Sequence, residues 1–269
     1  MYLADLHVHT TVSDCSETAE EILKKARALG MTHIAFTDHD TTALADVHVA
    51  LAASYGIQAI PAVEMSAIDQ KTGVKAHILG YGYKSTEHIE KIGQKTLKLR
   101  DHNSRKQIEI LRSLGYQVSI EEIQRMASGT IYKQHILDYL CKTGQSIQMF
   151  GSVYHEILKN GGPADFDITY PDVFEVVKAI KKDGGKAVLA HPGQQNNYYL
   201  IDPLVGIGLD GIECLHPVHK DLHVKQALSY AQRYDLFLTG GSDYHGRYAQ
   251  TQSRLLQYPA PLSSEKIFY

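Results

Sequence analysis

The stretch that decides the fold of this chain is ADLHVH, residues 4–9. Residues two positions apart in a β-strand point to the same side. A strand over residues 2–8 would therefore project His7 and His9 together, as two side chains must do to bind one metal ion. The pair by itself is equally compatible with two ordinary strand histidines, so its interpretation depends on the rest of the chain.

Length and composition restrict the class of protein. The chain has 269 residues, a formal charge of −3 and 43% hydrophobic residues, which suits one large domain or one domain with an insertion. The near-neutral charge argues against long nucleic acid as a ligand but leaves room for a small phosphorylated substrate. Three widely spaced cysteines without a CxxC motif predict neither a disulfide framework nor a thiolate zinc site.

The sequence also carries an expectation about location. The first residues lack the pattern of a secretory signal, and no apolar run reaches about 18 residues. We therefore expect a cytoplasmic protein without a membrane span. The oligomeric state is left open by these patterns.

Helical and extended patterns alternate along most of the chain. Short apolar runs are followed by amphipathic stretches that end at glycine, which predicts an α/β architecture with a mostly parallel sheet or barrel. The pattern is helical and charged from residue 86 to residue 165, and it alternates again from residue 166. We therefore predict an α/β body formed by residues 1–85 and 166–269, capped by a helical insertion over residues 86–165.

Residues of metal-binding type collect where the predicted strands end. Glu64, for example, follows a predicted strand over residues 57–63. In α/β proteins the carboxyl ends of the strands form the functional face. Two further candidates lie in the first loop and within an extended segment. The nine candidate metal ligands are His7, His9, Asp14, His39, Glu64, His77, His191, Asp243 and His245.

The number and type of these side chains indicate more than one metal ion. Imidazole and carboxylate donors without thiolate suit Zn²⁺, Mn²⁺ or Fe²⁺. Nine donors exceed the three or four that one ion takes, and they are enough for two or three ions. Closely spaced ions are a common device for hydrolysing phosphate esters. Glu64, with two oxygens, is the natural bridge between them.

Six segments of the chain together resemble the PHP (polymerase and histidinol phosphatase) phosphoesterase family: DLHVHTTVSD, FTDHD, AVEMS, HILGY, LAHP and GGSDYHG. The resemblance implies a distorted seven-stranded (β/α) barrel and three divalent ions. It implies three ligand sets: His7, His9, Glu64 and Asp243; Glu64, His77 and His191; and Asp14, His39 and His245. A hydroxide bridging the first two ions would attack phosphorus, with Glu64, His191 and Asp243 as catalytic residues.

The chain departs from the family pattern in two places. The first loop commonly reads SDG, and here Cys15 replaces the glycine; we interpret Cys15 as a small filler rather than a reactive thiol. The family insertion usually carries an arginine and a histidine that meet the substrate phosphate. Lys133 and His135 stand there in this chain and are predicted substrate contacts, although lysine lacks the bidentate fork of arginine. Lys133 could instead be a solvated residue at the start of a helix.

Four further residues carry more open expectations. His216 is a third candidate substrate contact, with a supporting role as the alternative. Asp38 and Asp40 flank His39, so we expect one of them to orient a ligand imidazole and the other to cap the next helix. Arg100 is expected on a solvated helix face, from which it could also reach a distal phosphate.

The predicted function is that of a metal-dependent phosphoesterase acting on a small phosphorylated metabolite. The preferred form is a monoesterase for a nucleotide or sugar phosphate. The change to Lys133 keeps open a cyclic-phosphate phosphodiesterase, for example for a phosphorylated ribose cyclic phosphate, and a 5′ exonuclease for short oligonucleotides is a third form. A non-catalytic metal-binding module belongs to a different class, and the complete set of nine ligands argues against it.

Overall fold

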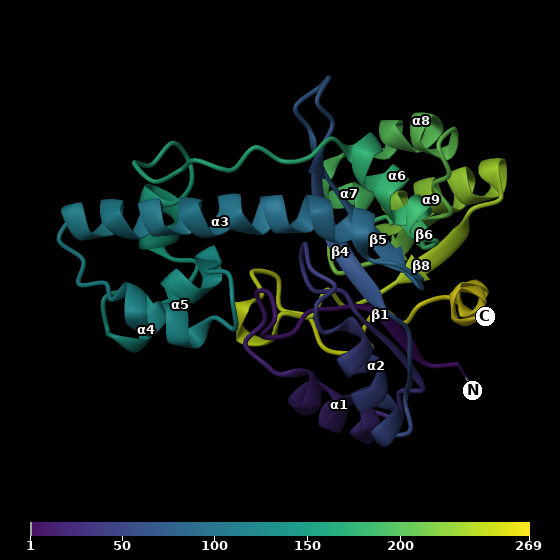
Figure 1. The fold of residues 1–269 in the computed structure, drawn as a ribbon, viewed down its shortest axis with the longest axis horizontal. Coiled ribbons are helices and arrows are strands. Elements are labelled where there is room, and N and C mark those ends of the chain that lie inside the picture. Colours follow the sequence, from purple (N-terminus) through teal and green to yellow (C-terminus); the bar gives the residue numbers. More distant parts are fainter. Residues whose placement is uncertain (1) are drawn as a thin grey trace.

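Two β-sheets form the centre of the molecule, and the computed structural model describes residues 2–269 (Figure 1). The first sheet is parallel and contains, in order, β1 (Ala4–Val8), β2 (His33–Phe36) and β3 (Gln58–Ala59). The second contains, in order, β4 (Ala62–Ile68), β5 (Lys75–Tyr81), β6 (Lys186–Leu189), β7 (Gly211–Leu215) and β8 (Phe237–Gly240).

The expectation of a mostly parallel arrangement is wrong for β4 and β5. β4 pairs antiparallel with β5, and β5 pairs antiparallel with β6, whereas β6, β7 and β8 are parallel. The reason is the tight turn between β4 and β5, in which Gly73 adopts a φ of 74° and its N–H donates to the carbonyl oxygen of Asp69 at 2.8 Å. A short turn of this kind joins only antiparallel strands, since parallel strands need a long crossover.

The two sheets meet along two seams but do not close into one barrel. Isolated bridges join Val8 to Tyr244 and His39 to Glu64. At the second seam the Asp40 N–H donates to the carbonyl oxygen of Glu64 at 2.9 Å. Pairing stops there because Asp40, with a φ of 58°, turns the chain out of the extended conformation. The α/β class is therefore confirmed, and the two sheets do not join into one closed barrel.

Helices cover the outer faces of both sheets (Figure 1). The first sheet shares an apolar core with two helices, and the second sheet shares a larger core with three. Amphipathic periodicity explains this packing, since Ile22, Leu23 and Ala26 on one face of the first helix are fully buried. The covering helices are α1 (Ala19–Ala28), α2 (Ala45–Ser54), α6 (Val173–Lys182), α8 (Ile201–Val205) and α9 (Asp221–Tyr234).

A second group of helices extends away from the sheets along one long helix, α3 (Glu87–Ser113) (Figure 1). With α3 it comprises α4 (Ile120–Met126), α5 (Lys133–Lys142) and a π-helical turn (Val153–Ile157). These helices share a hydrophobic core of their own, whose buried members lie between Ile108 and Ala164. The N-terminal part of α3 instead packs on the α/β body through the buried Ile89. The predicted helical character of this part of the chain is therefore observed.

The remaining elements are short. α7 (Pro192–Gln195) directly follows His191, and 3₁₀ turns occur at Tyr198–Leu200, Gly246–Tyr248 and Leu262–Phe268. The last of these lies near the start of the chain, where Tyr2 Oη is 2.8 Å from Ser264 Oγ. Within residues 2–269, no helix combines the length and the apolar character needed to cross a membrane.

Candidate metal centre

The elements deliver the predicted ligands to one place, although not always as expected. His7 lies in β1 and His39 follows β2. Glu64 is not placed after a strand but is the third residue of β4. The predicted strand over residues 57–63 is interrupted because Pro61 has no N–H to offer a ladder, so β3 ends at residue 59 and β4 begins at residue 62.

Glu64 lies at the centre of the cluster, with five imidazoles around its two oxygens. Its Oε2 is 3.1 Å from Nε2 of His7, 3.1 Å from Nε2 of His9 and 3.3 Å from Nδ1 of His39. Its Oε1 is 2.7 Å from Nδ1 of His77 and 2.9 Å from Nε2 of His191. A carboxylate shared in this way has the position of the bridge that the sequence predicted.

Two further carboxylates complete the cluster. Asp243 Oδ1 is 3.3 Å from Nε2 of both His7 and His9. Asp14 Oδ1 is 3.2 Å from Nε2 of His245 and 3.9 Å from Nε2 of His39. All nine predicted ligands therefore come together, and several groups have donor atoms within 4.8 Å of one another: His7, His9, Glu64 and Asp243; His9, Asp14, His39 and His245; His39, Glu64 and His77.

Unpaired donor atoms show that the cluster fits divalent cations. His7 Nε2, His9 Nε2, His39 Nδ1 and Asp14 Oδ1 are buried, and although each lies within 3.3 Å of a carboxylate oxygen or an imidazole nitrogen, none makes a hydrogen bond of suitable geometry within residues 2–269. Buried nitrogen and oxygen atoms are rarely left unpaired, because each costs about 1–3 kcal/mol. Metal ions bound between these atoms would satisfy all four.

The electrostatics of the cluster agree with this interpretation. Burial alone would raise the pKa values of Glu64 and Asp243, but the surrounding imidazoles hold both well below the ordinary range. Burial lowers the pKa of His39 to about 3. Burial also opposes protonation of His9, yet Asp243 and Glu64 raise its pKa to about 10. Ionised carboxylates are the form that binds metal, and a cation would replace the proton on His9.

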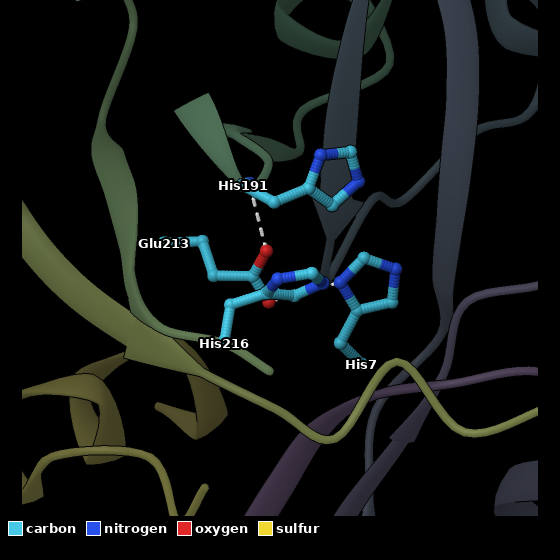
Figure 2. Close-up of side chains that lie close together, drawn as sticks. All are labelled: His7, His191, Glu213 and His216. Atoms are coloured by element: carbon cyan, nitrogen blue, oxygen red, sulfur yellow. Dashed lines mark hydrogen bonds and ion pairs between the residues drawn. The ribbon is translucent and has the colours of Figure 1, made fainter. Parts of the chain in front are cut away.

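One buried carboxylate beside the cluster was not predicted from the sequence. Glu213 is fully buried in β7; its Oε1 lies 2.9 Å from Nδ1 of His7, and its Oε2 accepts a hydrogen bond from the backbone N–H of His191 at 2.8 Å (Figure 2). The signal was present, since a carboxylate within the apolar run GIECL needs a buried partner. The prediction was confined to residues near strand ends, whereas Glu213 lies within a strand.

His216 also contacts a predicted ligand. Its Nε2 lies 3.2 Å from Asp243 Oδ2, and its Nδ1 accepts a hydrogen bond from the Val218 N–H at 3.3 Å. Because Nδ1 accepts the hydrogen bond from the Val218 N–H, the ring proton lies on Nε2, and the imidazole donates it to Asp243. Both ring nitrogens of His216 are thus engaged within the protein.

The expectations for Asp38, Asp40 and Arg100 are wrong. Asp38 accepts hydrogen bonds from the Thr10 N–H and the Ser13 hydroxyl, and so shapes the loop that carries Asp14. Asp40 accepts from Arg100 at 3.1 Å. Arg100 belongs to α3, and its guanidinium lies 5.0 Å over the ring of Tyr132 rather than on a solvated face. Each carboxylate found a partner far away in sequence, which local spacing cannot indicate.

A cavity of about 250 Å³ opens beside the cluster. Its lining combines cluster residues with side chains of the helical segment, among them Lys133, Gln134, Phe150 and Tyr154. Of the predicted substrate contacts, Lys133 and His216 line the cavity, whereas the buried His135 does not belong to its lining. The helical segment thus supplies one wall of the site.

The first turn of α5 and the residue before it show how that wall is built. His135 Nδ1 accepts a hydrogen bond from the Tyr132 N–H at 3.0 Å, which fixes the first turn of α5. Burial and the nearby Lys159 lower the pKa of Lys133 to about 8. Gln134, which the sequence analysis did not single out, donates from Nε2 to Asp14 Oδ2 at 2.8 Å and so ties α5 to a predicted metal ligand.

The family model described as the PHP domain matches residues 5–253. The chain belongs to the PHP family. This assignment confirms the family predicted from the six motifs, and it covers both the α/β body and the helical segment.

Named PHP relatives fall into three activities. The chain is 39% identical over 261 residues to a phosphoribosyl 1,2-cyclic phosphate 1,2-diphosphodiesterase of Eggerthella lenta, which covers 96% of this chain and 100% of the relative. It is 30% identical to a 3′,5′-nucleoside bisphosphate phosphatase of Chromobacterium violaceum, over 90% of this chain and 86% of the relative. It is 27% identical to a 5′-3′ exoribonuclease of Haemophilus influenzae, over 90% and 89%.

A solved PHP-like structure has the same fold. It comes from Bifidobacterium adolescentis, is described as a candidate metal-dependent phosphoesterase, and is 28% identical with a TM-score of 0.89. The match covers 98% of this chain and 94% of that chain. Together with the named relatives, it confirms the predicted class of hydrolytic phosphoesterase.

Cys15, which stands where the PHP first loop commonly has glycine, is enclosed by apolar side chains. Its side chain is buried within the apolar core beneath β1 and α1. Burial raises the pKa of the Cys15 thiol far above the neutral range. A thiol that stays protonated and buried is a poor nucleophile and a poor metal ligand. The environment therefore favours the interpretation of Cys15 as a filler.

Proposed function

We propose that this protein hydrolyses the cyclic phosphate ester of a small sugar that carries a further phosphate. The observation that carries the proposal is the match to the Eggerthella lenta diphosphodiesterase, which extends over nearly the whole of both chains. The first hydrolysis adds water to phosphorus and breaks one ring P–O bond, giving a phosphate monoester. A second hydrolysis of that monoester would release inorganic phosphate.

The nine clustered side chains would hold the divalent ions. We infer three sites with the ligand sets that the family resemblance implies, sharing Glu64 between the first two. Mn²⁺, Fe²⁺ or Zn²⁺ bound there would acidify water and neutralise charge on the phosphoryl oxygens. The short distances from Glu64 to five imidazoles support the shared position.

The protein groups have separate tasks in this proposal. Asp243 is ionised, so its carboxylate can accept a hydrogen bond from the attacking water and orient it. Glu64 and His191 line the cavity and would lie beside the reacting phosphate. Lys133 is the one lysine or arginine in the cavity lining, and we assign to it the distal phosphate. His216 would orient Asp243 rather than bind substrate, because both of its ring nitrogens are engaged.

The helical segment would act as the cap predicted for residues 86–165. Its separate core supports a semi-independent unit, and its side chains supply one wall of the cavity. We also infer that the two sheets, formed by residues 1–85 and 166–269, represent the distorted barrel of the family, open along the two seams. A cytoplasmic location remains the expectation from the sequence.

A second candidate substrate is a nucleoside 3′,5′-bisphosphate. Phe150 and Tyr154 both line the cavity, and their rings form an edge-to-face pair with centroids 5.1 Å apart. Such a pair offers an apolar surface against which a nucleobase could stack. A short oligonucleotide would need additional positive charge along its backbone, and the cavity lining holds Lys133 alone for that purpose.

The test combines metal analysis with a substrate panel. Protein purified without chelator should contain between about two and three divalent ions per chain, as two or three sites of three or four ligands require; one ion or fewer would contradict the metal centre. With added Mn²⁺, the highest kcat/KM should be found for a phosphoribosyl 1,2-cyclic phosphate. Preference for a nucleoside bisphosphate or for a short RNA would replace this substrate by the corresponding alternative.

A further inference from the structure

Strand β7 carries none of the nine predicted metal ligands, yet it places a buried carboxylate beside two of them. Glu213 is 0% exposed and lies between His7 from β1 and His191 from the end of β6 (Figure 2). Within the described part of the chain, both of its oxygens have a hydrogen-bond partner. A charge buried this completely is stable only because of those partners.

The first oxygen sets the orientation of His7. Glu213 Oε1 is 2.9 Å from Nδ1 of His7, so this nitrogen donates its proton to the carboxylate. The opposite nitrogen, Nε2, then points at the oxygens of Glu64 and Asp243, 3.1 and 3.3 Å away. A carboxylate behind an imidazole fixes both the ring orientation and the nitrogen that is free to bind metal.

The second oxygen holds the backbone of His191. Glu213 Oε2 accepts the His191 N–H at 2.8 Å. His191 has a φ of 25° and a ψ of 57°, a region that residues other than glycine rarely adopt and that surrounding contacts must maintain. On the far side of the turn, the Gly193 N–H donates to His219 Nε2 at 3.1 Å. The strained turn is therefore held at both ends.

We propose that Glu213 is a positioning residue that fixes His7 and His191 at the same time and so sets the spacing between two metal sites. His7 belongs to the first proposed ligand set and His191 to the second, and Glu64 touches both from the opposite side. The two ligands thus lie between Glu64 and Glu213. The donor atoms of His7, His191, Glu213 and His216 also lie within 4.8 Å of one another, but both oxygens of Glu213 are already taken by hydrogen bonds. The inference rests on the proposed metal centre.

The chain contains a matched control for this arrangement. Asp183 is also buried, and its Oδ1 lies 2.8 Å from Nδ1 of His88, while its Oδ2 accepts the Ile89 N–H at 2.8 Å. Bonds to an imidazole and to a backbone N–H thus occur here too, at the start of α3, together with a further bond from the His88 N–H to Asp183 Oδ2 at 3.0 Å. Neither His88 nor Ile89 belongs to the metal cluster.

The experiment compares Glu213→Gln with Asp183→Asn. Each change keeps the shape of the side chain but leaves only one accepting oxygen, for two donors at residue 213 and three at residue 183. Metal-free protein is titrated with Mn²⁺ or Zn²⁺, and thermal unfolding of the metal-free variants reports folding. We expect E213Q to weaken two of the three binding steps by about 10–100-fold, as is typical for carboxylates behind metal ligands, while D183N keeps wild-type affinities.

Kinetics at saturating metal provide the second readout. Because Glu213 is not among the residues that line the cavity, excess Mn²⁺ should restore most of the phosphate release of E213Q, with an unchanged KM for substrate. A raised KM at saturating Mn²⁺ would place Glu213 in substrate binding and overturn the inference. Wild-type metal affinity in E213Q, or equal losses in E213Q and D183N, would overturn it as well.

Failure of the metal centre itself gives a different result. In that case the wild-type protein binds one ion or fewer, and the inference falls with the centre. Should E213Q fail to fold, E213D takes its place, since aspartate keeps the charge but is too short to reach both donors. Weakened metal binding by folded E213D supports the inference, and wild-type binding by it refutes the need for both bonds.

Discussion

Two buried polar regions meet at residues 39 and 40, and they differ in what satisfies them. On one side of the backbone, His39 joins the metal cluster, where several buried nitrogens lack partners within residues 2–269. On the other side, Asp40 pairs with Arg100 at 3.1 Å, and Arg100 also donates to Ser66 Oγ at 3.0 Å. The metal cluster requires a bound cation, whereas the region around Asp40 already contains a cation, the guanidinium of Arg100.

The comparison teaches how a metal site can be told from a structural ion pair. Both regions are rich in charge and buried, so neither burial nor charge distinguishes them. The difference lies in whether a protein cation faces the carboxylate. The second region also connects the two halves of the molecule, because Arg100 belongs to α3 and Tyr132, before α5, donates from its hydroxyl to the carbonyl oxygen of His39 at 3.2 Å.

The largest effect is expected from breaking the metal cluster. Asp243→Asn removes one charged ligand, and we expect phosphate release to fall at least about 1000-fold, which corresponds to roughly 4 kcal/mol of barrier. The fold should remain, since the bridge between His39 and Glu64 at the second seam still joins the two sheets. Phosphate release with added Mn²⁺ and circular dichroism check this. Activity above a tenth of wild type would show that the chemistry lies elsewhere.

The next effect concerns the structural ion pair. Arg100→Met leaves Asp40 buried without a cation, and we expect a loss of about 3–5 kcal/mol in the free energy of unfolding. Urea unfolding of the metal-free protein measures it. Asp40 keeps its contacts to Ser66, so metal binding at saturating Mn²⁺ should survive in the folded fraction. A loss below about 1 kcal/mol would place the pair among ordinary surface contacts.

A smaller effect is expected at the cavity wall. Lys133→Ala should raise KM by about tenfold, or roughly 1.4 kcal/mol, with less change in kcat. The pKa of Lys133 is lowered to about 8, so its positive charge is present below that pH and is lost as the pH rises through it. KM of the wild type should therefore rise above pH 8.

Lys133→Arg is the matched variant, because a guanidinium stays charged throughout this range. The KM of K133R should therefore not rise above pH 8. Identical pH profiles for K133R and wild type, or an unchanged KM in K133A, would return Lys133 to the role of a helix-start residue that donates only to the carbonyl oxygen of Leu158.

The smallest effect is expected one turn further along α3. Arg105 pairs with Asp101 at 2.6 Å, but its side chain is 38% exposed. Arg105→Met should change the free energy of unfolding by about 1 kcal/mol or less, because water and salt screen exposed pairs. Arg105 also donates to Gln124 Oε1 at 2.6 Å, so R105M, measured beside R100M under the same conditions, compares a partly exposed ion pair with a buried one. Equal losses in the two variants would remove the distinction drawn between these ion pairs.

Much of the site could be predicted because its signals are local. Ligands such as His7 and His9 stand two residues apart at a strand end, and the motifs around Glu64 and Asp243 recur in order along the family. The exact place of Glu64 was wrong because a single proline divides the predicted strand in two. The hairpin that makes β4 and β5 antiparallel also depended on turn geometry around Gly73.

The sequence by itself determined which side chains were predicted as metal ligands, since strand periodicity and motif spacing act over a few residues. The tertiary structure alone decided which charges face a metal and which face a protein cation. Glu213 meets His7 across 206 residues of chain, and Asp40 meets Arg100 across 60. Such pairings arise when strands and helices pack, because a buried charge must find a partner wherever the fold brings one near.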